Sequence, residues 1–455
     1  MGENGKTNKI LEGVIWKELA LYSVPLIMGT IVQQLYTLVD TVVVGRFVGK
    51  EALASVGGPA SIITMIIIMF FNGLANGVSV VTAHCVGARD QKKLKESVHT
   101  AYLFSIVVSI ALSLLGVLAT PFLLEIMKTP QDMMDPSCEY LRIYFAGVIF
   151  TLVYNMGAAI MRAMGDSTRP FIFLIVSSVI NVILDLFMVV YLDMGIAGAA
   201  IATIIAQCVS AILATLALMN SYADMKLSFH ELRFHKAVLK EELRMGLPGA
   251  LQSSIMGLSG ILLQTCINTF GTDIVAGWAV YNKVDTICWI ACGSLSTAEA
   301  TFVGQNFGAK KMDRVYKSIR ASLYMGLAIT IFITGIMLIF STPIYGIFSK
   351  DPKVIAYGIY MFRFLAPFYL IGIFMDNISG GLRGMGDVFW PTIFTFGGMI
   401  FVRIPWILFA MYKSHTIATI MLSYPIGWTA TLVCLVPYYF YRKRENKNKS
   451  NLLKK

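Results

Sequence analysis

Two carboxylates lie inside long apolar stretches of this sequence. Asp40 falls in the stretch 19–44, and Asp185 falls in the stretch 171–192. A carboxylate within a membrane span costs roughly 2.5 to 3.5 kcal/mol on insertion scales, so its usual role is functional and its usual place is a cavity. For Asp40, the alternative is a position at the end of the span, among the lipid headgroups.

Two further polar residues are predicted to meet these acids. Asn181 lies four residues before Asp185 and so shares its helix face. The stretches with Asp40 and Asp185 run in the same direction, and each carries its acid near the end. The sixth stretch runs back and has Thr203 about two turns from its start. All four side chains are therefore expected at one depth.

This cluster is a candidate site for a proton or a cation. Two like charges in a medium of low polarity repel, so at least one acid holds a proton or both share a cation. We interpret Asp40, Asn181, Asp185 and Thr203 as the coupling site, with Asp40 and Asp185 as metal ligands if the ion is sodium. Interhelical hydrogen bonds that only tie helices together are the alternative. That alternative accounts for Asn181 and Thr203 but fits two acids poorly.

The first apolar stretch also contains a proline. Pro25 removes one bond from the helical ladder and displaces the carbonyl four residues before it, so the span should kink or unwind near Gly29. We predict that Pro25 and Gly29 form a hinge that lets the outer part of the span, with Asp40, move. A fixed kink that serves only packing is the alternative.

The composition is that of a polytopic membrane protein. Over 455 residues, 56% hydrophobic and 14% charged residues with a mean hydropathy of +0.70 exceed what a soluble surface tolerates. We count twelve apolar stretches, near residues 19–44, 53–80, 98–119, 139–161, 171–192, 197–219, 246–270, 276–303, 316–340, 354–382, 391–412 and 416–440. The net charge of +11 comes from alternate short loops and the C-terminal tail, which places both termini in the cytoplasm and argues against nucleic acid as a partner.

The two halves of the chain repeat. The segment Arg162–Asp166 recurs as Arg383–Asp387, an offset of 383 − 162 = 221. Each half holds six stretches, so both start on the same side, and the repeat is parallel about an axis along the membrane normal. The sequence predicts an all-α membrane protein with twelve transmembrane helices in two six-helix bundles. The predicted parts are a cytoplasmic N-terminal segment (1–18), an N-terminal lobe (19–220), a cytoplasmic linker (221–245), a C-terminal lobe (246–440) and a basic cytoplasmic tail (441–455).

The second half does not reproduce the polar cluster. At the same offset, the last three cluster residues become Val402, Trp406 and Tyr424. Its own candidates for contact with substrate or a second ion are Asp376, its counterpart Asn155 in the first half, and Glu299. A structural hydrogen bond is the alternative for Asp376, and a gate or helix-end role is the alternative for Glu299. Asp285 needs a partner elsewhere or interfacial water, and Arg403 is expected to pair with an acid.

Together these features resemble the MATE (multidrug and toxic compound extrusion) family. The resemblance covers about residues 15–440 and rests on the early proline, the polar cluster, the paired Arg-x-Met-Gly-Asp loops and the segment Thr301–Ala309. It implies a secondary antiporter that exports organic, often cationic and amphipathic compounds in exchange for protons or sodium ions. In the branch resembling the DNA-damage-inducible (DinF-like) transporters, the four clustered residues match the cation site. The branch resembling NorM uses acids on helices seven and ten, and here only Asp376 corresponds.

No sequence motif supports an enzyme or an ATP-driven pump, because Walker A, HExxH and nucleophile-elbow patterns are lacking. We therefore expect energy from an ion gradient and no cofactor, with H⁺ or Na⁺ as the coupling ion. The expected partners are small organic substrates and the lipid bilayer, for a monomer in the plasma or inner membrane. The main alternative is a flippase for lipid-linked oligosaccharides or polysaccharides of the same superfamily; a channel or an intramembrane enzyme is a weaker one.

Overall fold

The computed structural model describes residues 8–220, 225–414 and 416–452, and this part of the chain is almost entirely helical. Twelve of its helical segments are long and apolar enough to cross a membrane, from Ile15–Val48 to Ile417–Asn448. The predicted class, an all-α membrane protein with twelve spans, is confirmed. No strand occurs in the described ranges.

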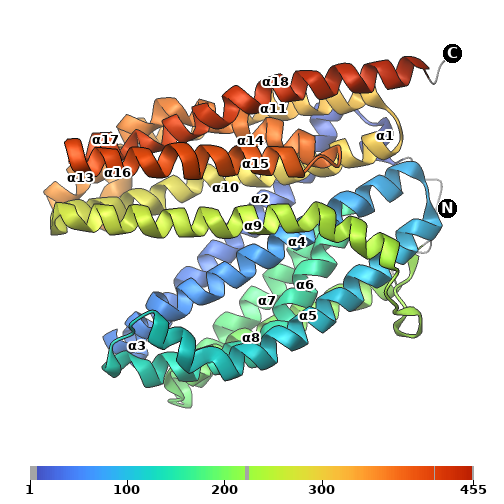
Figure 1. Ribbon diagram of the computed structural model, residues 1–455. Helices are drawn as coiled ribbons and strands as arrows, with labels where there is room; N and C mark the ends of the chain where they lie inside the picture. Colours follow the sequence, from blue (N-terminus) through green and yellow to red (C-terminus); the bar gives the residue numbers. More distant parts are fainter. Residues whose placement is uncertain (1–7, 221–224, 415, 453–455) are drawn as a thin grey trace. The chain divides into compact units, whose positions relative to one another are not determined.

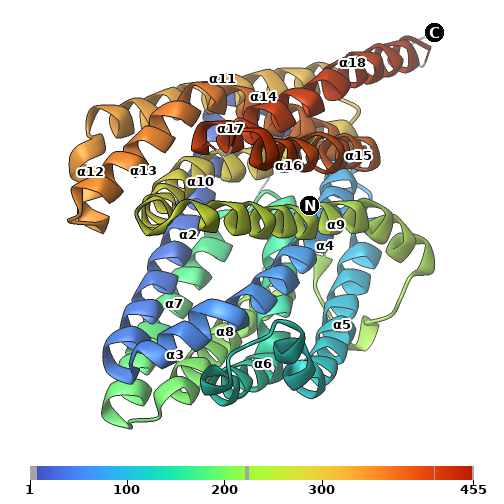
Figure 2. The ribbon, with the colours of Figure 1, turned by 60° about the vertical axis from the view of Figure 1, so that its left-hand side comes forward.

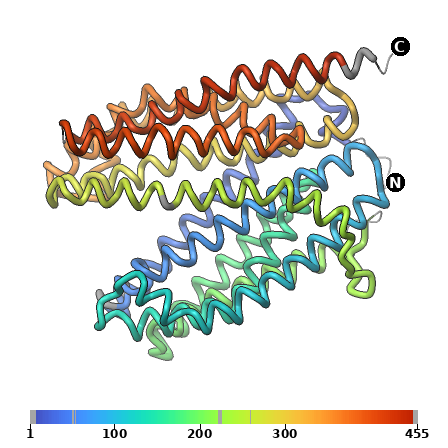
Figure 3. Tube along the Cα trace, viewed as in Figure 1, coloured from blue at the N-terminus to red at the C-terminus, as the bar shows by residue number. Residues whose placement is uncertain are grey.

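The chain divides into two compact units. Val24–Ala250 form the first unit, and Lys9–Ser23 together with the chain from Leu251 onward form the second. Two helices, α2 (Ile15–Val43) and α9 (Lys236–Ile267), therefore begin in one unit and continue in the other. Figure 3 traces α9 as one long helix.

These boundaries differ from the predicted ones at 19 and 246. The first turns of α2 pack on the second unit, where the Tyr22 ring lies edge-on to Phe302 with centroids 5.6 Å apart. Of the predicted linker 221–245, residues 221–224 lie outside the described residues, and α9 begins within it at Lys236, in a run of helix-forming residues. The predicted tail 441–455 is helical as far as it is described, because α18 (Ser423–Leu452) continues into it.

The first unit is built around α6. The helices of this unit beyond α2 are α3 (Lys50–Ser55), α4 (Ser61–Ala88), α5 (Gln91–Ile126), α6 (Gln131–Ala163), α7 (Thr168–Asp185) and α8 (Gly195–Asn220). Figure 2 shows α6 between α5 and α8, the two helices against which it packs most extensively. Fully buried side chains such as Phe71, Leu152 and Met156 fill the space between these helices.

Glycines let α9 approach α4 closely within this unit. A Cβ atom added at Gly77 would lie 2.2 Å from the backbone nitrogen of Gly246, and one at Gly73 would lie 2.3 Å from the Cα of Ala250. Small residues at such crossings are what allows membrane helices to touch backbone to backbone. The first turns of α9 are thereby fixed to the first unit.

The second unit is built around α10. Besides the parts of α2 and α9 assigned to it, the unit contains α1 (Lys9–Glu12), α10 (Thr272–Gly308), α11 (Met312–Ile339), α12 (Ser341–Phe348), α13 (Pro352–Leu365), α14 (Tyr369–Gly384), α15 (Phe389–Gly397), α16 (Ile404–Lys413), α17 (Ile417–Met421) and α18. The long α10 packs against α11, α13 and α14, and α14 packs against α18 (Figure 1). Tyr281, Phe362 and Tyr369 lie fully or almost fully buried among them.

Several spans contain a short π-helical turn, in which the chain is wound more widely than in an α-helix. These turns are η1 (Val44–Val48), η2 (Val56–Ala60), η3 (Leu186–Tyr191) and η8 (Gly398–Arg403). Single π turns inside α-helices occur frequently at functional sites. Here one of them directly follows Asp185, and another ends at Arg403.

Candidate functional site

The structure brings the predicted polar cluster together inside the first unit. Asp40 lies near the end of α2, Asn181 and Asp185 near the end of α7, and Thr203 in α8. Asp185 is fully buried and Asn181 is 1% exposed, while Asp40 is half-buried. The charges of Asp40 and Asp185 are close enough to act on one another. The predicted convergence in space is therefore present, and the role of the cluster stays a prediction.

The polar atoms of this cluster have unused hydrogen-bonding capacity. Both carboxylate oxygens of Asp185, the Oδ1 of Asp40 and both amide atoms of Asn181 are buried without a hydrogen-bond partner among the described residues. A buried polar group without a partner is costly, so each such atom needs an explanation. Carboxylate, amide and hydroxyl oxygens are ligands for hard cations, and a carboxylate also takes a proton.

Three tyrosines that the sequence analysis missed border the cluster. The Tyr36 hydroxyl donates to the Thr203 hydroxyl at 3.4 Å, and the rings of Tyr140 and Tyr144 stack with centroids 6.3 Å apart. The charges of Asp40 and Asp185 act on both Tyr36 and Tyr140. The signal that could have found Tyr36 is its spacing, because it precedes Asp40 by four residues and so shares its helix face.

A π-helical turn follows each acid of the cluster. In α2 the turn η1 begins four residues after Asp40, and in α7 the turn η3 begins at the residue after Asp185. A wider turn shifts the register of the side chains that follow and leaves the ladder locally weaker. Both acids therefore sit at points where their helices depart from regular geometry.

The predicted hinge lies next to the point where the chain passes between the units. That passage falls after Ser23, and Pro25 stands two residues further on within α2. The helix does not unwind at Gly29, because a proline removes only one ladder bond and the remaining bonds carry the helix on to Val43. A Cβ at Gly29 would make ordinary contacts with Phe171.

A proline also marks the second passage. Pro248 stands two residues before Ala250, the last residue of the first unit, within α9. Each helix that passes from one unit to the other therefore contains a proline, which removes one ladder bond, two residues from the last residue before the passage. The signal was present in the sequence, where each half opens with Glu, Leu and then Pro.

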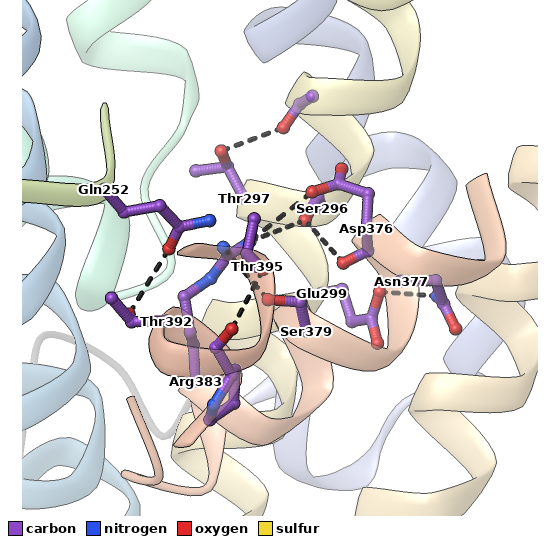
Figure 4. A network of polar contacts seen from close by, with 12 residues as sticks. Gln252, Ser296, Thr297, Glu299, Asp376, Asn377, Ser379, Arg383, Thr392 and Thr395 are labelled. Atoms are coloured by element: carbon purple, nitrogen blue, oxygen red, sulfur yellow. Dashed lines mark hydrogen bonds and ion pairs between the residues drawn. The ribbon is translucent and has the colours of Figure 1, made fainter. Parts of the chain in front are cut away.

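The acids of the second unit form a separate cluster around a small pocket. Glu299 is fully buried and accepts a hydrogen bond from the Asn377 amide at 2.6 Å, and Asp376 lies 3.7 Å from the Arg383 guanidinium. Arg383 also donates to Ser296 at 3.1 Å, as Figure 4 shows. Glu299, Asp376 and Asn377 line the pocket together.

One prediction about this part of the chain needs correction, and another stays a prediction. Asn155, the counterpart of Asp376, lies in α6 of the first unit, and its contact with substrate or a second ion stays a prediction. Arg403 makes no ion pair among the described residues of its unit; its guanidinium carbon lies 4.0 Å from the ring centre of Tyr424. The reason is that aromatic rings surround this part of the unit, so a ring face replaces the expected carboxylate.

Asp285 has a partner on another helix, one of the two possibilities that its position left open. It accepts a hydrogen bond from the Tyr369 hydroxyl of α14, and that hydroxyl lies 3.3 Å from the Tyr281 hydroxyl of α10. The sequence allowed such a partner for Asp285 but gave no sign of which span supplies it.

The geometry of both units can be compared with known proteins. The MatE family model matches residues 25–187 and 248–408, most of both units. The chain belongs to the MatE family. Its relatives include the probable multidrug resistance protein YoeA of Bacillus subtilis, 29% identical over 451 residues that cover 95% of each chain. A protein named FAD transporter, from Shewanella oneidensis, is 23% identical over 350 residues that cover 76% of this chain and 77% of its own.

Solved structures show the same fold. An outward-facing multidrug resistance transporter of the MATE family superposes with a TM-score of 0.90 at 22% identity, covering 98% of this chain and 100% of its own. A MATE structure described as bent gives a TM-score of 0.90 over the same shares, also at 22% identity. The chain thus has the fold of MATE multidrug transporters, with twelve spans in two six-helix halves. The polar clusters of the first and second units lie within this fold.

Proposed function

We propose that this MatE family member is a secondary antiporter that exports organic, often cationic and amphipathic compounds in exchange for protons or sodium ions. The observation that carries the proposal is the pair Asp40 and Asp185, two buried or half-buried acids in one apolar unit that have no basic partner among the described residues. Such a pair is stable only when a proton or a cation neutralises it, so its occupancy depends on the ion gradient.

Occupancy of this pair is the step that selects between two packings of the helices. Neutralising one acid removes both a desolvation penalty and a repulsion. Moving a two-state equilibrium from 1:99 to 99:1 takes about 5.5 kcal/mol of differential affinity, which a buried charge change of this kind supplies. The ion is cargo in this scheme, and no resident cofactor takes part.

Pro25 is the point at which α2 responds. The helix is held by the second unit up to Ser23 and carries Asp40 in the first unit, so a bend at Pro25 moves Asp40 relative to the held segment. Two solved MATE structures are described as being in a bent and in a straight conformation, which supports a change of conformation in this fold. We propose that the chain lies in the plasma membrane with both termini in the cytoplasm; its bacterial relatives and the positions of Lys and Arg support this.

The proposal is tested by dye efflux from proteoliposomes with proton and sodium gradients imposed separately. Efflux of a fluorescent cationic dye should follow one of the two gradients, collapse when an ionophore dissipates it, and be indifferent to ATP. Efflux that survives the ionophore, or that requires ATP, would contradict the proposal.

A further inference from the structure

The second unit carries a group of exposed basic side chains where α11 begins and α18 ends. We call them the basic face; its members are Lys317, Arg320, Lys443, Arg444 and Lys447. In the part of the chain that the structure describes, none of their charged groups forms an ion pair or a hydrogen bond. Several positive charges are therefore gathered at one end of the unit without counter-ions.

Other basic residues of the same two helices are already occupied by protein groups. Arg314 of α11 donates to the Ile10 carbonyl at 3.0 Å. Arg442 of α18 lies 2.9 Å from the Asp387 carboxylate and 2.6 Å from the Glu445 carboxylate. These acids are thereby neutralised by a residue outside the basic face, so they do not offset its charge.

The corresponding part of the first unit is built differently. There Lys93, near the start of α5, lies 2.8 Å from the Glu241 carboxylate. At the repeat offset of 221, Lys317 corresponds to the acidic Glu96. The shared packing of the two halves therefore does not require the basic face.

The two helices of the basic face lie beside one another at this end of the unit (Figure 1). The Tyr316 ring of α11 lies edge-on to the Tyr439 ring of α18, with centroids 6.3 Å apart. The Lys443 ammonium lies over the Tyr316 ring at 5.4 Å, and the Asn446 amide donates to the Tyr316 hydroxyl at 3.4 Å. The charge of Arg320 acts on Tyr439. The basic residues of both helices thus form a single patch around two tyrosines.

Each helix continues from the basic face into an exposed stripe of rings and aliphatic side chains. On α11 the exposed residues along one helix face are, in order, Lys317, Arg320, Tyr324 and Ile331. On α18 the same spacing recurs in the opposite direction, in the order Lys447, Arg444, Phe440 and Val433. Spacings of three, four and seven residues keep each stripe on one face of its helix. Charge, then ring, then aliphatic side chain is the order of environments from the headgroups of a bilayer to its acyl chains.

We propose that the basic face binds the headgroup of an anionic phospholipid, whose acyl chains lie along the two stripes. Basic pockets between membrane helices hold anionic headgroups in this way, with arginine as a planar fork and lysine as a point charge on the phosphate. A soluble anion or a nucleic acid would meet the charges but make no use of the stripes. The inference concerns the bilayer and not the exported compound, so it does not depend on the proposed antiport.

The test compares two lipids that have the same acyl chains and differ in net charge. Palmitoyl-oleoyl phosphatidylglycerol and palmitoyl-oleoyl phosphatidylcholine are added separately to the purified full-length protein in detergent. Native mass spectrometry then gives the affinity for the first lipid bound. The wild-type protein should bind phosphatidylglycerol about tenfold or more tightly than phosphatidylcholine, because several basic residues act on one headgroup. Glycerol phosphate, the soluble headgroup alone, should not displace the bound lipid.

Variants assign the preference to its residues. Arg320→Gln and Lys443→Gln should each weaken phosphatidylglycerol binding by roughly fivefold, the usual effect of one basic residue at a membrane surface, and leave phosphatidylcholine binding as it was. Lys92→Gln removes an exposed charge from α5 of the first unit and is the matched control; it should keep the wild-type preference. Tyr324→Ala removes a ring of the stripe without a change of charge and should weaken the binding of both lipids.

Three results would overturn the inference. The first is a wild-type protein that binds the two lipids equally well, a comparison that needs no variant to fold. The second is a loss in Lys92→Gln as large as that in Arg320→Gln, which would mean that only the net charge of the protein matters. The third is displacement of the lipid by glycerol phosphate, which would make the basic face a site for soluble anions.

Discussion

The two units share a repeat in sequence but use their polar residues in opposite ways. In the first unit, Asp40 and Asp185 act on each other and have no basic partner among the described residues. In the second, Asp376 lies beside Arg383, and Glu299 is bonded to Asn377. A repeat preserves the helix packing, which depends on small and apolar residues, while the few polar positions are free to diverge.

The divergence is sharpest at the positions of the ion cluster. At the repeat offset of 221, Asn181 corresponds to Val402, Asp185 to Trp406 and Thr203 to Tyr424. At these positions the first unit has amide, carboxylate and hydroxyl groups, and the second has an aliphatic side chain and two aromatic rings. Under the proposed function, this difference predicts that ion coupling depends on the first unit and not on the corresponding positions of the second.

The largest expected effect comes from replacing one acid in each unit and comparing the ion dependence of efflux. Asp40→Asn keeps the side chain's size and removes its charge, so ion-driven efflux should fall by more than about tenfold, because the amide takes no proton. Asp376→Asn should retain the ion dependence, since Arg383 keeps its bonds to Ser296 and Ser379. Efflux from proteoliposomes measures both. Equal loss of ion dependence in both variants would remove the distinction between the units.

The packing of α9 on α4 gives the next effect. Gly77→Ala would place a Cβ 2.2 Å from the backbone of Gly246, which cannot move aside as a side chain can. Overpacking of this kind costs roughly 1–3 kcal/mol or more, so the thermal unfolding temperature in detergent should fall clearly. The repeat counterpart is Ala298, which already carries this methyl group, fully buried. A Gly77→Ala protein with wild-type unfolding would mean that the two helices separate without cost.

Pro25 gives a smaller, kinetic effect. Pro25→Ala restores the missing ladder bond and should slow export severalfold while substrate binding stays intact. Gly29→Ala is the control, because the added methyl makes only ordinary contacts with Phe171 and Leu174. Spin-label distances between the two halves of α2 should change with pH or ion in the wild type and less in Pro25→Ala. A bend that is the same under all conditions would remove the hinge from the mechanism.

A surface ion pair of the first unit gives the smallest effect. The Lys95 ammonium lies 2.6 Å from the Glu231 carboxylate, with the two side chains 45% and 48% exposed, and it holds the pKa of Glu231 below its ordinary value. The contribution is present at neutral pH and is lost as the pH falls through that lowered pKa. Exposed pairs contribute little, so Lys95→Ala should leave the unfolding temperature and export unchanged. A clear loss would mean that this loop takes part in coupling.

Much of the fold followed from hydropathy and the repeat, because these patterns depend on residue type alone. The twelve spans and the placement of Asp40 and Asp185 in one polar cluster were predictable in this way. The passage of α2 and α9 from one unit to the other was not, because hydropathy does not tell which bundle a helix end packs against. The bonding of Asp285 to Tyr369 was equally hidden, since it depends on the rotation of two helices about their axes.

The central claim is that the first unit couples transport to the ion while substrate binding lies elsewhere. It is tested most directly by comparing gradient-driven accumulation with substrate exchange in proteoliposomes that contain Asp185→Asn. Exchange of labelled for unlabelled dye at equal ion concentrations needs binding and movement but no net ion flux. The account predicts that Asp185→Asn keeps exchange and loses accumulation. Accumulation at the wild-type rate under the same gradient would contradict it.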